Sequence, residues 1–185
     1  YTMHSTLKRS VIENHYNIKG QLLQKVKHQT YLGVELAHNL KWGDHIKQIT
    51  SKANRTIGCL RRNLHHAPKE VKNLTYTSVV RPILDYASAA WDPHQSSDIN
   101  ALENVQRKAA RYVCNDYRQS ESVSCMMEEL GWQSLASRRK AHRLTLMYKI
   151  KRNSIPIPNP ELKRSNRNTR YTHDLAYSTE TPRTD

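Results

Sequence analysis

The chain has 185 residues, of which 30 are Lys or Arg and 16 are Asp or Glu, giving a formal net charge of +14. This imbalance costs self-repulsion and is typical of proteins with a polyanionic partner or a basic tail. No apolar run reaches the roughly 18 residues of a membrane-spanning helix, and the first residues lack the apolar stretch of a signal peptide. Three widely spaced cysteines without a C-x-x-C pair predict reduced thiols in an intracellular protein, nuclear or cytoplasmic.

Residues 1–40 are predicted to form short β-strands. Ile18 and Leu22 flank a turn signal at Lys19-Gly20, which predicts a hairpin. The stretch TYLGVEL, residues 30–36, is rich in β-forming residues, and Gly33 within it marks a bend or a close approach of the backbone. Because three short strands bury too little surface to be stable alone, we expect the edge of a sheet whose other strands are missing or lie upstream.

From Asp44 onward the apolar period is helical. A first helix, residues 44–64, carries one apolar stripe made of Ile46, Ile49, Ala53, Ile57, Leu60 and Leu64. Pro68 suits the first turn of a second helix, whose core face is predicted to comprise Val71, Leu74 and Val79. Pro82 should kink or interrupt this helix, and the core face is predicted to resume with Ile83, Tyr86, Ala87, Ala90 and Trp91.

The remaining helical pattern ends near residue 152. A helix begins near Ser97, its expected cap, and a short helix is stopped by Gly131. The last helix, residues 134–151, contains no acid, and its apolar positions are Leu135, Ala141, Leu144, Met147, Tyr148 and Ile150. We therefore predict a mostly helical α+β fold in three parts: strands over 1–40, a helical bundle over 41–152 and a basic, disordered tail over 153–185.

Six stretches follow one another in a recognisable order. They are YLGV (31–34), LKWGDHI (40–46), KANRTIGCLRRNL (52–64), VVRPILDYASAAWDP (79–93), LENVQRKAARYV (102–113) and GWQSLASRRKAHRLTLMYKI (131–150). In this order and spacing they resemble the region that follows the catalytic palm in reverse transcriptases of jockey-like non-LTR (LINE-type) retrotransposons. The resemblance covers about residues 1–152.

The resemblance implies an RNA-directed DNA polymerase as the parent enzyme, with an RNA–DNA template-primer as its partner and Mg²⁺ as its cofactor. YLGV would belong to the primer grip, so that Tyr31 and Leu32 position the primer and Gly33 lets the backbone approach it. The alternative is an edge strand that packs on a core, with a glycine bulge. The helices would form the thumb, and STLKRS, residues 5–10, would follow the catalytic turn. The palm and fingers are missing partners.

The catalytic carboxylates of such an enzyme are not found in this sequence. Polymerisation needs two Mg²⁺ ions held by converging aspartates, and the chain has no Asp-Asp pair. Glu128 and Glu129 are adjacent, but on a helix neighbours point about 100° apart. We assign no catalytic residue and no metal ligand, and expect that the chain alone does not polymerise DNA. Helix caps or surface positions are expected for Asp44, Asp85, Asp92, Asp98 and Asp116.

Basic residues on the predicted helices are the candidate nucleic-acid contacts, because Lys and Arg neutralise phosphates without regard to sequence. The first helix supplies Lys47, Lys52, Arg55, Arg61 and Arg62; the helix near Ser97 supplies Arg107, and the last helix supplies Arg138, Arg139 and Arg143. Solvated charged faces are the alternative interpretation.

Two other functions stay open from the sequence. The chain is either an inactive transposon remnant, used or not as a protein-interaction module, or an unrelated basic helical RNA-binding protein. The tryptophans, Trp42, Trp91 and Trp132, are expected to anchor helix junctions in the core, with base stacking as the alternative.

Overall fold

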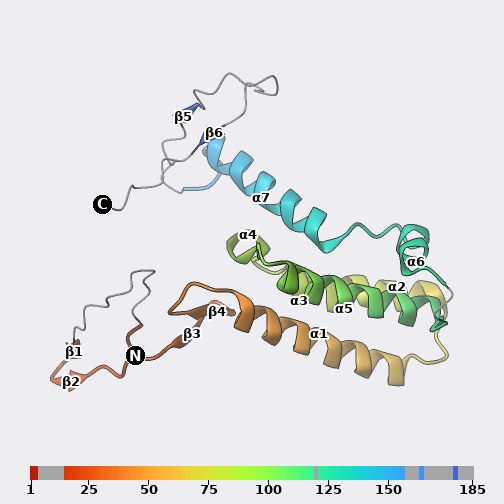
Figure 1. The fold of residues 1–185 in the computed structure, drawn as a ribbon, viewed down its shortest axis with the longest axis horizontal. Coiled ribbons are helices and arrows are strands. Elements are labelled where there is room, and N and C mark those ends of the chain that lie inside the picture. The colour runs from red at the N-terminus through yellow and green to blue at the C-terminus, as the bar shows by residue number, and fades with distance from the viewer. Residues whose placement is uncertain (4–14, 119–120, 157–162, 165–176, 179–185) are drawn as a thin grey trace. The chain divides into compact units, whose positions relative to one another are not determined.

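The computed structural model describes residues 1–3, 15–118, 121–156, 163–164 and 177–178 (Figure 1). It divides into two compact units, residues 1–142 and 143–185. The fold is α+β and mostly helical, with short antiparallel strand pairs before the helices, as the sequence predicts. The segment 5–10 and most of the tail lie outside the described residues, and the predicted division at residues 40 and 152 stays a prediction.

Two antiparallel hairpins precede the helices. Their two-residue turns, Lys19-Gly20 and Leu32-Gly33, have positive φ at both positions, a geometry that matches the twist of the paired strands. The hairpin predicted at Lys19-Gly20 is therefore confirmed, and the bend predicted at Gly33 is the tip of a second hairpin. The strands are β1 (Asn17–Ile18), β2 (Gln21–Leu22), β3 (His28–Tyr31) and β4 (Val34–Ala37).

The helices follow the predicted order closely. Pro68 precedes α2, and Ser134 accepts a hydrogen bond from the Ser137 backbone N–H (3.1 Å) at the start of α7. Ser97 lies inside the first turn of α5 and does not cap it. The elements are α1 (Gly43–Asn63), α2 (Lys69–Thr75), the π-helical turn η1 (Tyr76–Val80), α3 (Arg81–Asp85), α4 (Ser88–Trp91), α5 (Ser96–Cys114), α6 (Val123–Glu129), α7 (Leu135–Lys151), β5 (Lys163–Arg164) and β6 (Tyr177–Ser178).

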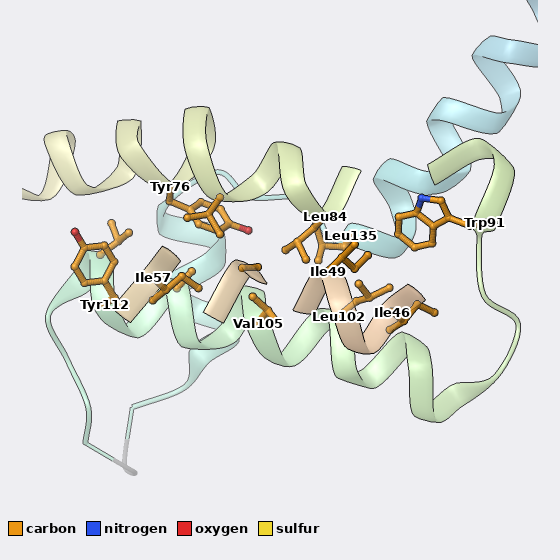
Figure 2. Packing of buried hydrophobic residues seen from close by; sticks show 14 of the residues in the cluster. Ile46, Ile49, Ile57, Tyr76, Leu84, Trp91, Leu102, Val105, Tyr112 and Leu135 are labelled. Carbon is orange, nitrogen blue, oxygen red and sulfur yellow. The ribbon is translucent and has the colours of Figure 1, made fainter. Parts of the chain in front are cut away.

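The core of the first unit lies between α1, α5 and the segment α2–η1–α3. Figure 2 shows the side chains of these helices meeting, with Ile46, Ile49 and Ile57 of α1 close to Leu102 and Val105 of α5. Each fully buried aliphatic side chain contributes about 1.5–3 kcal/mol relative to an exposed one. The apolar stripe predicted for the first helix is thus the face that joins α1 to the bundle.

The core face predicted for the second helix is wrong. Val71, Leu74 and Val79 are exposed, whereas the buried positions are Lys72, Tyr76, Val80 and Leu84. The face that α2 buries is therefore the one with Lys72, not the one with Val71 and Leu74. The interruption predicted at Pro82 is a π-helical turn, η1, which lies just before this proline and widens the helix from Tyr76 to Val80.

The apolar stripe predicted for the last helix is also largely wrong. Leu135 is fully buried, but Leu144, Met147 and Tyr148 are 61 %, 40 % and 57 % exposed. Those three residues belong to the second unit. In the first unit, by contrast, Trp91 is fully buried and donates from Nε1 to the carbonyl of Tyr86 at 2.7 Å, as expected of a tryptophan that anchors a helix junction.

Candidate nucleic-acid interface

The turn of the second hairpin contacts Tyr86, the residue that follows the C-terminal end of α3. Tyr86 Oη donates to the Leu32 carbonyl at 3.0 Å. A Cβ on Gly33 would lie 3.5 Å from the Tyr86 ring, and the φ of Gly33 is 79°, so the left-handed backbone requires a glycine there. Tyr86 was predicted to lie in the core; it is exposed and positions the turn instead.

Leu32 and Tyr31 do not pack into a core. Leu32 is 73 % exposed and Tyr31 is 65 % exposed, and all of β3 faces solvent. Leu32 also has a φ of 48°, a left-handed conformation that costs a residue with a Cβ about 1–2 kcal/mol. The structure therefore contradicts the core-packing alternative for these two residues and presents a leucine at the tip of the turn.

A groove of about 580 Å³ lies between this turn, α1 and α3. It brings together four of the predicted contact residues: Leu32 and Gly33 from the turn, and Lys52 and Arg55 from α1. No acidic side chain is among the residues that line it. The other lining residues are Thr30, His45, Gln48, Ile49, Pro82, Ile83 and Tyr86.

His45 is a buried polar group on the wall of the groove. Its Nδ1 accepts the Glu35 backbone N–H at 3.2 Å, which places the ring proton of the neutral form on Nε2. Burial lowers the pKa of His45, and the nearby Glu35 only partly opposes this shift. Nε2 has no hydrogen-bond partner among the described residues. Nε2 is also fully buried, so His45 packs in the wall of the groove and offers no donor to a ligand.

The remaining basic residues of α1 lie on its exposed face. Lys47 is one turn from the helix start and lies 3.9 Å from Asp44. Arg61 and Arg62 line a different cavity near the end of α1.

The predicted contact on α5, Arg107, is exposed and donates to Asn104 of the same helix at 3.2 Å. Of the predicted contacts, only Lys52 and Arg55 share the groove with the turn.

The structure corrects the role predicted for two arginines of the last helix. Arg139 is 1 % exposed and its Nε lies 2.7 Å from an oxygen of Asp92. Arg138 pairs with Asp85, also at 2.7 Å, and both of its carboxylate contacts are to the same oxygen. Arg139 cannot reach a phosphate, and Asp85 and Asp92 are largely buried partners, not caps or surface residues. Arg143 is exposed and belongs to the second unit.

Sequence reasoning missed His45 and Lys72. His45 stands four residues before Ile49, and Lys72 four residues before Tyr76, so both occupy core-facing steps of their helices. They are 2 % and 5 % exposed, but the sequence does not predict this burial when polar residue types are assigned to the solvent face. The spacing of each polar residue from a buried apolar or aromatic residue four positions later is the feature of the sequence that indicates it.

The described residues do not fit the magnesium that the resemblance implies for a parent enzyme. No group of three His, Cys, Asp or Glu side chains within that part of the chain is arranged to hold a metal ion. Within the same residues, none of the helices combines the length and hydropathy needed to cross a membrane.

Comparisons with protein-family models, curated proteins and solved structures gave no match to this chain.

Proposed function

We propose that this chain binds an RNA–DNA template-primer duplex as the part of a non-LTR reverse transcriptase that follows the palm. The observation that carries the proposal is the acid-free groove between the Leu32-Gly33 turn and α1, with Lys52 and Arg55 among its lining residues. The order of hairpin, basic helix and helical bundle supports it, because the resemblance implies the same order.

The groove offers two kinds of contact to a nucleic-acid backbone. Lys52 and Arg55 neutralise phosphates, a contribution that is independent of sequence. Leu32 presents an apolar surface to sugars at the rim. Together these contacts fix the position of a strand and read no base.

Charge reversal within the groove tests this proposal. The variants Lys52→Glu and Arg55→Glu are each compared with Lys140→Glu, an exposed position on α7 outside the groove. Anisotropy titrations of a labelled RNA–DNA hybrid should show a loss of about tenfold for each groove variant, because a phosphate contact becomes a repulsion. The Lys140 variant should bind within about twofold of the wild type, since distant exposed charges are screened.

One observation favours the alternative of a protein-interaction module. Val71, Leu74 and Val79 are three exposed apolar side chains on α2 and η1, and exposed apolar surface is a feature of partner sites. If both groove variants bind the hybrid as tightly as the wild type, the nucleic-acid proposal fails and this face becomes the better account of what the chain does.

A further inference from the structure

Two further cavities lie near the C-terminal ends of α1 and α5. The larger, of about 450 Å³, is lined by Arg61, Arg62, His65, Lys72, Tyr112, Asn115 and Tyr117. The smaller, of about 280 Å³, is lined by Asn54, Ile57, Gly58, Arg61, Lys108, Arg111, Tyr112 and Tyr117. The two adjoin, because they share Arg61 and both tyrosines. Neither has an acidic lining residue.

Lys72, which lines the larger cavity, is a buried lysine. It is 5 % exposed, and its ammonium lies 5.7 Å from the centre of the Tyr112 ring, within the range of a cation–π contact. No hydrogen bond or ion pair joins that ammonium to another described residue. The side chain is thus covered along its stem, while the ammonium is not among the fully buried unpartnered atoms and Lys72 lines the larger cavity. An anion in that cavity would meet a lysine that no acid of the described residues neutralises.

Two acids in this part of the chain, Glu129 and Asp116, are paired with basic side chains. Glu129 binds the Lys69 ammonium. The Arg118 guanidinium, through hydrogen bonds, lowers the pKa of Asp116 to about 2, and Arg118 Nη2 lies 2.6 Å from Asp116 Oδ2. Arg111 donates to the carbonyl of Arg118 at 2.8 Å, which holds this basic side chain beside the smaller cavity. The cavities thus keep a positive charge.

We propose that the cavity around Lys72 is a binding site for a phosphate group, with Lys72 as its buried ligand and Arg61 and Arg62 closing over the anion. A guanidinium offers two parallel donors to phosphate oxygens, while a lysine acts as a point charge at depth. The site is separate from the groove beside Leu32, and the inference does not depend on the proposed function.

The test is calorimetric titration of the full chain with tripolyphosphate at an ionic strength held constant with KCl. Lys72→Met removes the buried charge and keeps the side-chain stem, and Lys140→Met removes an exposed charge of the same sign. Saturable binding by the wild type should weaken about tenfold or more in Lys72→Met, the equivalent of one charge-assisted hydrogen bond. Lys140→Met should bind within about twofold of the wild type.

Two further measurements keep the result interpretable. At the same concentration, tripolyphosphate should raise the melting temperature of the wild type by more than that of Lys72→Met, because the variant binds it more weakly. Arg61→Gln, at an exposed position, should also lose affinity, and it replaces Lys72→Met if that variant does not fold. The site is overturned if the wild type shows no saturable binding, or if Lys72→Met and Lys140→Met weaken binding equally.

Competition identifies the source of the phosphate. Displacement of tripolyphosphate by a 5′-phosphorylated oligonucleotide, and not by its unphosphorylated twin, supports the site and assigns it to a strand end. If neither oligonucleotide displaces the anion, the site stands and takes a small free phosphate compound. Equal displacement by both contradicts a separate site, because internal phosphodiesters then suffice.

Discussion

Leu32 has two features that are unusual for a leucine, a left-handed backbone conformation and a largely exposed side chain. The first position of a two-residue hairpin turn with positive φ favours asparagine or glycine, and here a leucine holds a φ of 48° while 73 % exposed. Backbone strain of this kind clusters at functional sites. Tyr86 stabilises the strained turn through its hydrogen bond to the Leu32 carbonyl.

Replacing Leu32 should separate stability from binding. We expect Leu32→Asn to raise the free energy of unfolding by about 1 kcal/mol, because asparagine tolerates the left-handed region, and to weaken binding of the RNA–DNA hybrid. Urea denaturation and anisotropy measure the two effects. Leu22→Asn, on the exposed surface of β2, is the matched control and should change neither. A stabilised variant that binds as well as the wild type would show that the turn is only structural.

At the scale of elements, ion pairs as well as Leu135 hold the start of α7, residues 135–142, in the first unit. Arg138 and Arg139 reach Asp85 and Asp92 near the ends of α3 and α4. The backbone N–H groups of Leu135 and Ala136 donate to Glu103 of α5, at 3.4 and 2.9 Å. The start of α7 is thus fixed by ion pairs to Asp85 and Asp92 and by backbone hydrogen bonds to Glu103 of α5.

Breaking the buried pair should be costly. Arg139→Met leaves the largely buried Asp92 without this guanidinium, and we expect a loss of about 3 kcal/mol in the free energy of unfolding. Lys140→Met, one residue along on the exposed side, should stay within about 0.5 kcal/mol of the wild type. Urea denaturation monitored by circular dichroism compares them. Equal stability of the two variants would contradict the structural role given to Arg139.

The elements differ in how far the sequence predicts them. The buried face of α1 follows from its strict three- and four-residue steps, and the groove residues Lys52 and Arg55 follow from its basic half. The buried face of α2–η1–α3 does not follow, because a lysine, Lys72, occupies the core-facing position of α2 and a π-helical turn then changes the period from Tyr76 onward. Arg139 was assigned to the surface because the acid that neutralises it, Asp92, is distant in sequence.

At the scale of the whole molecule, the net charge of +14 is distributed unevenly. Arg138, Arg139, Lys69 and Arg118 are paired with acids. The groove beside the Leu32-Gly33 turn and the cavities at the end of α1 have no acid among their lining residues. Among the described residues, α1 therefore connects two places that are lined by basic and not by acidic side chains, and our proposal of a polyanionic partner rests on this arrangement.

The salt dependence of binding tests this account most directly. For the full chain and an RNA–DNA hybrid, the logarithm of the binding constant should fall linearly with the logarithm of the KCl concentration. Its slope should be roughly −0.9 for each phosphate neutralised, and Lys52→Glu should reduce the magnitude of that slope by about one. A binding constant that does not change between low and high salt, or no binding at low salt, would contradict the claim that basic side chains of α1 hold a nucleic-acid backbone.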